Sequence, residues 1–379
     1  MKIAIFFNLP SGGAKRALFE QVKRLTRHHQ VDIYTLSTAN HDFCDLRKLV
    51  KNYFISDFNY QNIFPFNLLS VYFQLPKIEN KIATDIDQRG YDVVLVCHDL
   101  FTQAPLLLRY LKTPSVYFCQ EPKREFYETI PRVEKKISYF LTYPFRLPIK
   151  YIDRANILAA KLVLVNSVYS QNLIKNIYGV KSEVNYLGVD TDLFHRLPNV
   201  KKENIILSVG GFNLLKGHDF IIKTLSLFSK DKRPELIIVG NGGEDKKYLK
   251  CLANDLEVRV KHVENVSDRE LLRWYNKAKI FVYAPILEPF GLATLEAAAC
   301  GLPIVAVNEG GAPEVLKNIK SAILINRNEK NVSKKITQLL SEQLNYSIIT
   351  KDIQNIKQNY NWKNSTTELE KYLLHVSKP

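Results

Sequence analysis

An α/β fold with two Rossmann-like domains is the prediction for this 379-residue sequence. Residues 2–28 pass from a buried strand through a Gly-containing turn into an amphipathic helix, and residues 205–229 repeat that order. Residues 280–316 give a strand, an Ala-rich helix and another strand, with Gly and Pro at the junctions. Strands that alternate with helices are typical of parallel sheets, and the length is sufficient for two hydrophobic cores.

The first domain is expected to span residues 1–197. Its strands and helices follow from short β-branched runs and from apolar residues at helical spacing. The strands are expected over residues 2–7, 31–36, 92–97, 115–119 and 162–166, and the helices over 14–28 and 168–178. Gly12 and Gly13 lie in the first turn, where they either let a ligand approach the backbone or only permit a tight turn. No G-x-G-x-x-G follows a strand, which argues against a nicotinamide enzyme.

The second domain is expected to span residues 198–359, after a polar linker over 198–204. Its strands are expected over residues 205–209, 236–239, 258–263, 280–283 and 304–307, and its helices over 218–229, 249–256, 268–277 and 293–300. Residues 332–374 are expected to be mostly helical. Both domains therefore begin with the same architecture, although they share no repeated sequence.

Composition and charge narrow the class of protein. Hydrophobic residues make up 46% and charged residues 24%, as in soluble globular proteins. No apolar run is long enough to span a bilayer, and a secretory leader is not expected from the residues after Met1. The five cysteines are scattered and form no C-x-x-C pair, which argues against a disulfide framework or a zinc site and indicates a reducing, cytoplasmic setting.

The net charge of +15 calls for an acidic partner. Nucleotide phosphates, an anionic membrane surface and nucleic acid would all fit, and a surplus of surface lysine also explains the value. No recognised nucleic-acid motif is present, so a nucleic-acid partner is not expected.

Two segments of the first domain are rich in aromatic residues. Residues 60–76 are apolar without a regular period, and residues 132–154 mix aromatic with basic side chains. Each is either a cover for the core or a surface that contacts anionic lipid, and the scarcity of acidic residues in 132–154 favours lipid. We therefore expect peripheral association with the inner face of a membrane.

Polar residues follow two central strands of the first domain. His98 follows the strand over residues 92–97, and Gln120 follows the strand over 115–119. In open α/β sheets, ligands bind at the carboxyl ends of the strands, so both are candidates for contact with a ligand. A hydrogen-bonded structural role is the alternative for His98.

The most informative stretch is 280–316. Glu288 and Glu296 stand eight positions apart on either side of a Gly turn that opens a helix. The first amides of a helix have no partners within it and bind anions. Lys216 follows the Gly-rich loop after the strand over 205–209 and is the natural cation for a diphosphate. Asp190-Thr191-Asp192 has the look of a metal motif, but its place in a turn favours a capping role, and no metal is expected.

The stretch from Glu288 to Gly311, EPFGLATLEAAACGLPIVAVNEGG, resembles the retaining glycosyltransferases of the GT-B fold, family four. Gly12-Gly13, Gly188-Val189-Asp190 and Lys216-Gly217 support the resemblance, which covers most of the chain. It implies two facing domains with a deep cleft between them, and a last helix over about 360–379 that packs back on the first domain.

The resemblance also implies a role for each site residue. Glu288 would hold the transferred sugar and Glu296 the ribose, while Lys216 would hold the diphosphate. Glu288 and Lys216 are the expected catalytic residues, and Gln120 and His98 the candidate sugar contacts. The expected donor-binding set is Gly12, Gly13, Gly210, Gly211, Lys216, Glu288, Phe290, Gly291, Leu292 and Glu296.

The implied activity is metal-independent transfer of a hexose from a nucleoside-diphosphate sugar to a glycan or lipid-linked acceptor, with retention and without a cofactor. The family usually has Arg at the position of Gly211 and often His at that of Gln120, so one phosphate-binding cation is missing here. These departures motivate the alternative, a sugar-nucleotide-binding or glycan-binding protein of the same fold with little or no turnover.

Overall fold

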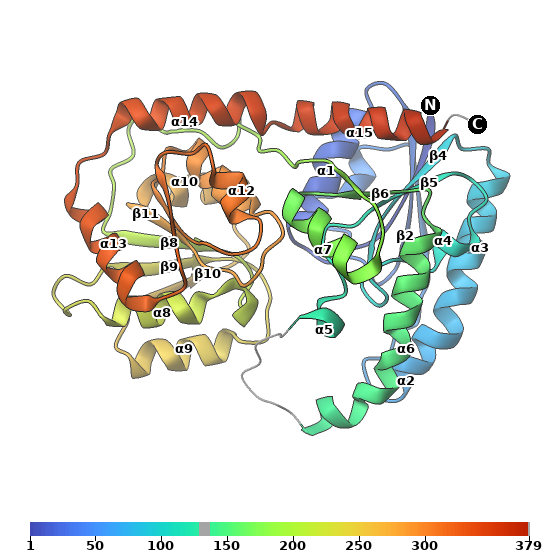
Figure 1. Ribbon diagram of the computed structural model, residues 1–379, viewed down its shortest axis with the longest axis horizontal. Coiled ribbons are helices and arrows are strands. Elements are labelled where there is room, and N and C mark those ends of the chain that lie inside the picture. The colour runs from blue at the N-terminus through green and yellow to red at the C-terminus, as the bar shows by residue number, and fades with distance from the viewer. Residues whose placement is uncertain (129–136, 378–379) are drawn as a thin grey trace. The chain divides into compact units, whose positions relative to one another are not determined.

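The computed structural model describes residues 1–128 and 137–377, which form two compact units (Figure 1). Among the described residues, the first unit takes residues 1–128, 137–186 and 362–377, and the second takes residues 187–361. The division therefore falls ahead of the expected boundary at residue 197. Residues 187–197 are held in the second unit because the Asn276 side chain accepts from Leu197 N and donates to His195 O.

The first unit contains a parallel sheet in the order β3-β2-β1-β4-β5-β6-β7. Its strands are β1 (Lys2–Asn8), β2 (Gln30–Leu36), β3 (Asn52–Ser56), β4 (Val93–Asp99), β5 (Ser115–Phe118), β6 (Leu162–Val165) and β7 (Glu183–Val184). Every residue of β4 is buried, as expected for a central strand covered on both faces.

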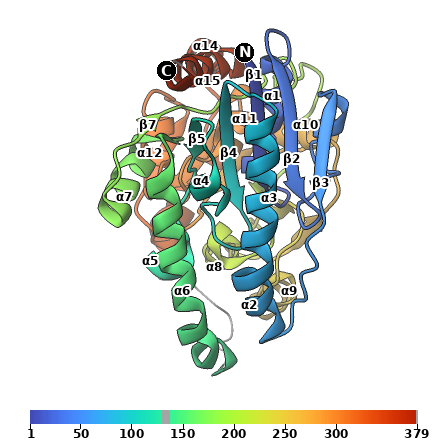
Figure 2. The ribbon, with the colours of Figure 1, turned by 90° about the vertical axis from the view of Figure 1, so that its right-hand side faces the viewer.

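Helices cover both faces of this sheet. The helices are α1 (Gly13–Leu25), α2 (Phe66–Leu69), α3 (Leu75–Gln88), α4 (Leu107–Tyr110), α5 (Arg124–Tyr127), α6 (Ile137–Ala159), α7 (Val168–Tyr178) and α15 (Trp362–Ser377). Figure 2 shows α3 and α6 in front of the sheet, where they share a core with alternate strand residues such as Phe6 and Val94. Phe7 points to the opposite face, which α1 covers.

The second unit contains a parallel sheet in the order β10-β9-β8-β11-β12-β13. Its strands are β8 (Ile205–Val209), β9 (Glu235–Val239), β10 (Val260–Val263), β11 (Ile280–Tyr283), β12 (Ile304–Val307) and β13 (Ala322–Ile325). Its helices are α8 (His218–Ser226), α9 (Lys246–Asp255), α10 (Asp268–Lys277), α11 (Leu292–Ala299), α12 (Ala312–Leu316), α13 (Glu329–Ser341) and α14 (Tyr346–Asn359). Because β8 lies beside β11, the loops after these two strands meet at one edge.

The two aromatic segments are mainly helical where the structure describes them. Residues 66–74 form α2 and a π-helical turn that leads into α3, and residues 137–154 lie within α6. Arg132, Lys135 and Lys136 of the second segment lie outside the described residues. Among the described helices, none combines the length and the apolar character needed to cross a bilayer.

Candidate functional site

An ion pair joins the loops that follow β8 and β11. Lys216 ends a 3₁₀ turn (Leu214–Lys216), and its Nζ lies 2.9 and 2.7 Å from the two carboxylate oxygens of Glu288. Both side chains keep part of their surface exposed to solvent. The pair therefore stands at the carboxyl edge of the sheet, where a ligand can compete for either partner.

Close backbone contacts fix the position of Lys216. Gly217 has φ 67, and a Cβ there would lie 1.8 Å from the carbonyl oxygen of Ala284. Ile286 N also donates to Leu215 O at 2.8 Å, so the loops after β8 and β11 are bonded directly to each other. Only glycine permits this approach, because any side chain would collide with the neighbouring backbone.

A buried histidine supports the Gly210-Gly211 turn. His218 Nε2 lies 3.3 and 3.2 Å from the carbonyl oxygens of these two glycines, and Ser208 Oγ lies 3.2 Å from Nδ1. Burial lowers the pKa of His218 to about 4, so the neutral ring donates to the carbonyls and accepts from Ser208. Sequence reasoning placed His218 at the start of a helix but did not assign it this role.

The loop that carries Glu288 packs against a second pair of glycines. Gly311 N donates to Glu288 O at 2.8 Å, and a Cβ on Gly310 would lie 2.3 Å from the same oxygen. The conformation of the Glu288 backbone thus depends on the segment after β12. The Gly310-Gly311 pair therefore positions Glu288 by packing.

Helix α11 begins directly after this loop. Its N-cap is Gly291, with φ 95, and no side chain caps it. A Cβ at Gly291 would lie 2.7 Å from the hydroxyl of Tyr283, so a larger residue would be excluded. The dipole of α11 and its first amides, with Lys216, provide positive potential for an anion.

Glu296 lies deeper, on the second turn of α11, with a relative exposure of only 6%. The Tyr275 hydroxyl, from α10, donates to its Oε2 at 2.8 Å. A carboxylate accepts several hydrogen bonds, which suits a ribose diol. Sequence analysis did not identify Tyr275, because its position in a periodic helix is equally typical of a core residue.

Tyr283 is a second residue that sequence analysis did not identify. Its hydroxyl is buried beside Gly291 and has no hydrogen-bond partner among the described residues. Burial, with a smaller contribution from the charge of Glu288, raises the pKa of Tyr283 well above its ordinary value. The hydroxyl is therefore a neutral group that can donate to a ligand oxygen at the start of α11. A strand-end aromatic residue carries no sequence signal for this role.

The remaining predicted residues belong to the first unit. Gly12 is the N-cap of α1 and Gly13 its first residue, and both are exposed. His98 and Gln120 lie together at the ends of β4 and β5, where Gln120 N donates to His98 Nε2 at 2.9 Å. Burial, with help from Lys123, lowers the pKa of His98 to about 3, so the ring is neutral. This hydrogen bond agrees with the structural role considered for His98.

Asp190 behaves as the turn interpretation predicts. Its Oδ1 accepts from Asp192 N at 3.0 Å and from Leu193 N at 3.1 Å. This arrangement is an Asx turn, in which the side chain replaces a backbone acceptor. The D-x-D pattern therefore stabilises local backbone.

Family comparisons agree with this arrangement. The model described as Glycosyltransferase Family 4 matches residues 11–193, and the model described as Glycosyl transferases group 1 matches residues 189–360. Together they extend over both units.

Individual relatives point the same way. An uncharacterized glycosyltransferase of Methanocaldococcus jannaschii is 29% identical over 170 residues, which cover 44% of this chain and 43% of that protein. The match thus spans less than half of that relative. The alpha-1,3/1,6-mannosyltransferase ALG2 of Saccharomyces cerevisiae is 25% identical over 82% of this chain and 70% of that protein.

Among solved structures, HepE of Anabaena in complex with UDP-glucose superposes with a TM-score of 0.76 at 18% identity. The superposition covers 99% of this chain and 100% of that chain. Both family models match the chain, and each unit has a parallel sheet, with the candidate site at the strand ends of the second. The chain therefore belongs to the family four, or group 1, glycosyltransferases and has their GT-B fold.

Proposed function

We propose that this glycosyltransferase moves a hexose from a nucleoside-diphosphate sugar to a glycan or lipid-linked acceptor, with retention of the anomeric configuration and without a bound metal. The observation that carries the proposal is the Lys216–Glu288 pair beside the uncapped start of α11. ALG2 is named a mannosyltransferase, and HepE was solved with UDP-glucose, which supports a sugar nucleotide as the donor.

The chemistry requires stabilisation of the leaving diphosphate. The bond between the anomeric carbon and the diphosphate oxygen breaks, and its electron pair leaves with the diphosphate. The acceptor oxygen bonds to the same face of that carbon, and its proton passes to the departing diphosphate. Lys216 and the first amides of α11 would stabilise the charge that develops on the diphosphate, which is the role a metal has in other enzymes.

The ion pair suggests how donor binding prepares Glu288. Before the donor binds, Lys216 neutralises Glu288. A diphosphate that takes up the ammonium would release the carboxylate for a sugar hydroxyl or for the positive charge that develops at the anomeric carbon. Glu296, already oriented by Tyr275, would accept from the ribose.

We also propose that the first unit binds the anionic inner surface of a membrane. We call the exposed apolar residues of 63–73 and α6 the aromatic surface: Ile63, Phe64, Phe66, Leu69, Phe73, Phe140, Leu141, Phe145, Tyr151 and Leu158. The two segments contact each other, since Tyr72 OH donates to Phe145 O and the rings of Phe64 and Phe145 lie 5.6 Å apart. An exposed apolar patch of this extent is unusual on an isolated soluble protein.

The basic residues near the aromatic surface favour anionic lipid as its binding partner. Residues 60–76 contain no charged side chain. Helix α6 carries Lys150 and Arg154 as well as Arg146, which pairs with Glu125, and its one acidic residue, Asp153, is buried. Apolar insertion with basic residues nearby is the pattern of interfacial helices. A lipid-linked acceptor would be presented at such a surface.

The donor experiment tests the central proposal. UDP-, GDP- and ADP-hexoses are screened for thermal stabilisation, and a donor at 100 times its dissociation constant should add about 2.7 kcal/mol. Product analysis then determines whether the anomeric configuration is retained, with and without a metal chelator. Transfer that disappears in Glu288→Ala supports the proposal, whereas binding without turnover supports the alternative of a catalytically weak binding protein.

A further inference from the structure

An arginine beyond the last strand of the second sheet reaches the loop that carries Glu288. Arg327 lies two residues after β13, and its Nη2 donates to the carbonyl oxygens of Ala284 and Pro285 at 3.1 and 2.9 Å. These two residues follow β11 and lie shortly before Glu288 in the chain. Arg327 therefore holds the entry to the Glu288 loop, although β13 is not a neighbour of β11 in the sheet.

The same guanidinium is paired with a carboxylate at the end of the strand between them. Glu309 lies two residues after β12, and its two carboxylate oxygens accept from Nε and Nη2 of Arg327 at 2.8 Å each. Bidentate pairs of this kind are among the strong hydrogen bonds of proteins, and both side chains are mostly shielded from solvent. The centroid of the Phe220 ring, from α8, lies 5.2 Å from the guanidinium carbon. Arg327 thus joins the ends of β11, β12 and β13.

Glu309 continues this connection to the exit of the Glu288 loop. It directly precedes Gly310 and Gly311, and Gly311 N donates to Glu288 O at 2.8 Å. The entry to the loop is therefore held by Arg327 directly, and the exit is held through Glu309 and the two glycines.

The loop between these points contains a strained residue. Leu287, directly before Glu288, has φ 49, in the left-handed region that residues with a side chain rarely adopt. Such a conformation is unfavourable and persists only where the surrounding structure enforces it. If the loop were released, Leu287 would return to an ordinary conformation and the Glu288 side chain would point in a different direction. The position of the carboxylate therefore depends on the contacts at both ends of the loop.

We propose that Arg327, paired with Glu309, is a positioning residue for Glu288 in the transfer reaction. This inference rests on the proposed function for the role of Glu288 at the sugar. Arg327 does not replace the phosphate-binding cation that is missing at Gly211, because its Nε and Nη2 groups already donate to Glu309 and to two carbonyl oxygens.

The position of Lys216 should be less sensitive to Arg327. The turn that ends at Lys216 has support of its own, since Lys216 N donates to Asn213 O at 3.1 Å and Leu214 N donates to Asp245 Oδ2 at 2.9 Å. Loss of Arg327 should therefore displace the carboxylate that acts at the sugar, while the groups proposed for the diphosphate stay in place. The expected signature is a lower kcat with an affinity for the nucleoside diphosphate that is no weaker than in wild type.

Kinetics of Arg327→Ala, Glu309→Ala and the double variant test the pair. Arg327→Ala should lower kcat by about tenfold to 10²-fold, because a misplacement of about 1 Å is sufficient for such a loss. Glu309→Ala should reproduce part of this loss, and the double variant should be no slower than Arg327→Ala, because the two residues act as one unit. Arg327→Lys should give an intermediate kcat, since a single ammonium cannot reproduce the bidentate pair and both carbonyl contacts.

Three kinetic results would overturn the proposal. The first is a normal kcat in Arg327→Ala, or in Arg327→Lys if the alanine variant does not fold. The second is weaker binding of the nucleoside diphosphate by Arg327→Ala, which would identify Arg327 as a phosphate ligand. The third is a double variant in which the losses of the two single variants multiply, because the two residues would then act independently.

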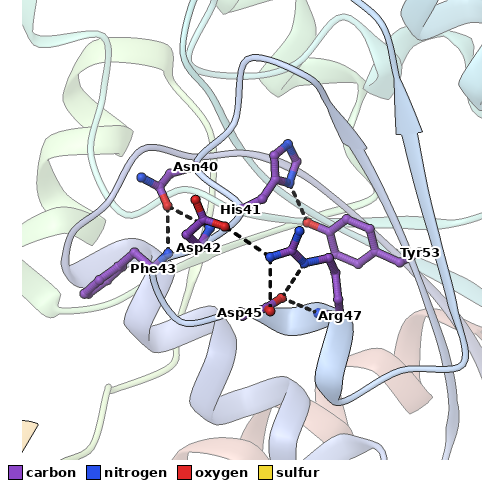
Figure 3. A network of polar contacts seen from close by, with 7 residues as sticks. All are labelled: Asn40, His41, Asp42, Phe43, Asp45, Arg47 and Tyr53. Atoms are coloured by element: carbon purple, nitrogen blue, oxygen red, sulfur yellow. Dashed lines mark hydrogen bonds and ion pairs between the residues drawn. The ribbon is translucent and has the colours of Figure 1, made fainter. Parts of the chain in front are cut away.

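Arg47→Ala is the matched control, because Arg47 also binds a carboxylate through two nitrogens but lies in the first unit. Its Nε lies 2.8 Å from Asp45 Oδ1, and a terminal nitrogen lies 3.1 Å from Asp45 Oδ2 (Figure 3). The same loop has a separate contact of 2.8 Å between His41 Nδ1 and the Tyr53 hydroxyl (Figure 3). Arg47→Ala therefore removes a bidentate pair without changing the Glu288 loop, and kcat should stay at the wild-type value.

Hydrogen–deuterium exchange distinguishes this inference from the proposed function, because it needs no turnover. In Arg327→Ala, the amides of residues 284–291 and 308–312 should exchange faster than in wild type, since the contacts that hold these segments are lost. In Arg47→Ala their exchange should be unchanged. Unaltered exchange in Arg327→Ala would overturn the inference. Faster exchange in Arg327→Ala, together with a wild type that transfers sugar from no donor, would contradict the proposed function alone.

Discussion

Lys216 and Glu288 are 72 positions apart in the sequence, yet the Nζ of the lysine contacts both oxygens of the carboxylate. The contact exists because β8 and β11 are neighbours in the sheet and Gly217 lets their loops touch. Each charge holds the other in place before a donor arrives. The pair therefore links the groups proposed for the diphosphate and for the sugar.

Lys216→Ala is expected to be unusually damaging. Gly211 leaves Lys216 and the amides of α11 to stabilise the diphosphate, so kcat/KM should fall by about 10²–10³, the cost of losing one such stabilising group. Steady-state kinetics on the identified donor measure the loss. Lys277→Ala is the matched control, since Lys277 pairs with Glu203 at an exposed position of the same unit. Near-normal turnover in Lys216→Ala would contradict the role proposed for it.

Glu288→Gln is expected to separate binding from turnover. The amide cannot hold the ammonium of Lys216 as an ion pair, so the lysine is free for phosphate and the nucleoside diphosphate should bind at least as tightly as in wild type. Turnover should nevertheless fall steeply, because the sugar no longer contacts the carboxylate of residue 288. Calorimetry and kinetics on the same samples test this. Weaker diphosphate binding would show that the ion pair with Glu288 does not limit the affinity of Lys216 for the diphosphate.

Tyr275→Phe tests the orientation of Glu296. The substitution removes the 2.8 Å hydrogen bond to Oε2 but keeps the ring. We expect the KM for the nucleotide sugar to rise by about tenfold or more, because a hydrogen bond to a charged group contributes roughly 1.5–3 kcal/mol. Tyr248→Phe, in α9 of the same unit, is the control. An unchanged KM would mean that Glu296 needs no support from α10.

Part of this site could be predicted from the sequence. The strands over 280–283 and 304–307 were predicted with the bounds that the structure shows, because short apolar runs ended by Gly and Pro have few alternatives. Glu288 and Lys216 were predicted from motif and chemistry. Their contact depends on strand order, and strand order is set by long-range pairing that no local pattern records.

Other features have no local signal. Tyr275 reaches Glu296 from a different helix, and the apolar spacing of α10 explains it equally well as a core residue. Residues 66–74 lack a regular period because a π-helical turn interrupts the α-helical repeat, which shifts the apolar residues off one face. Lys15 looks like one of many surface lysines until the structure shows it buried.

Membrane binding is expected to depend on the aromatic surface. In Ile63→Ser/Phe73→Ser, binding to vesicles of 70% neutral and 30% anionic phospholipid should fall by more than about tenfold, since burying each such side chain contributes roughly 1.5–3 kcal/mol. Leu227→Ser, at an exposed apolar residue of the second unit, is the control. Co-sedimentation gives the bound fraction. Equal binding by both variants would contradict the proposal. It would also be contradicted if the wild-type protein is a dimer and the double variant is a monomer, because the aromatic surface would then be a dimer interface.

Lys15 should make the free energy of unfolding depend on pH in the alkaline range. Burial lowers its pKa from 10.5 in the unfolded chain to about 8 in the fold. Below pH 8 both states are protonated and the fold bears the full cost of the buried charge. Between about pH 8 and 10.5 only the unfolded state keeps the proton, so wild type should gain up to about 1.4 kcal/mol per pH unit relative to Lys15→Met.

Urea unfolding of the two proteins from pH 7 to 10 measures this difference. The charged or titratable groups around Lys15 are His41, Cys44, Asp45, Arg47 and Cys97. They are present in both proteins, as is Lys202, whose pKa burial also lowers to about 8, so their contributions largely cancel. A flat difference would mean that Lys15 already has a counter-ion in the fold.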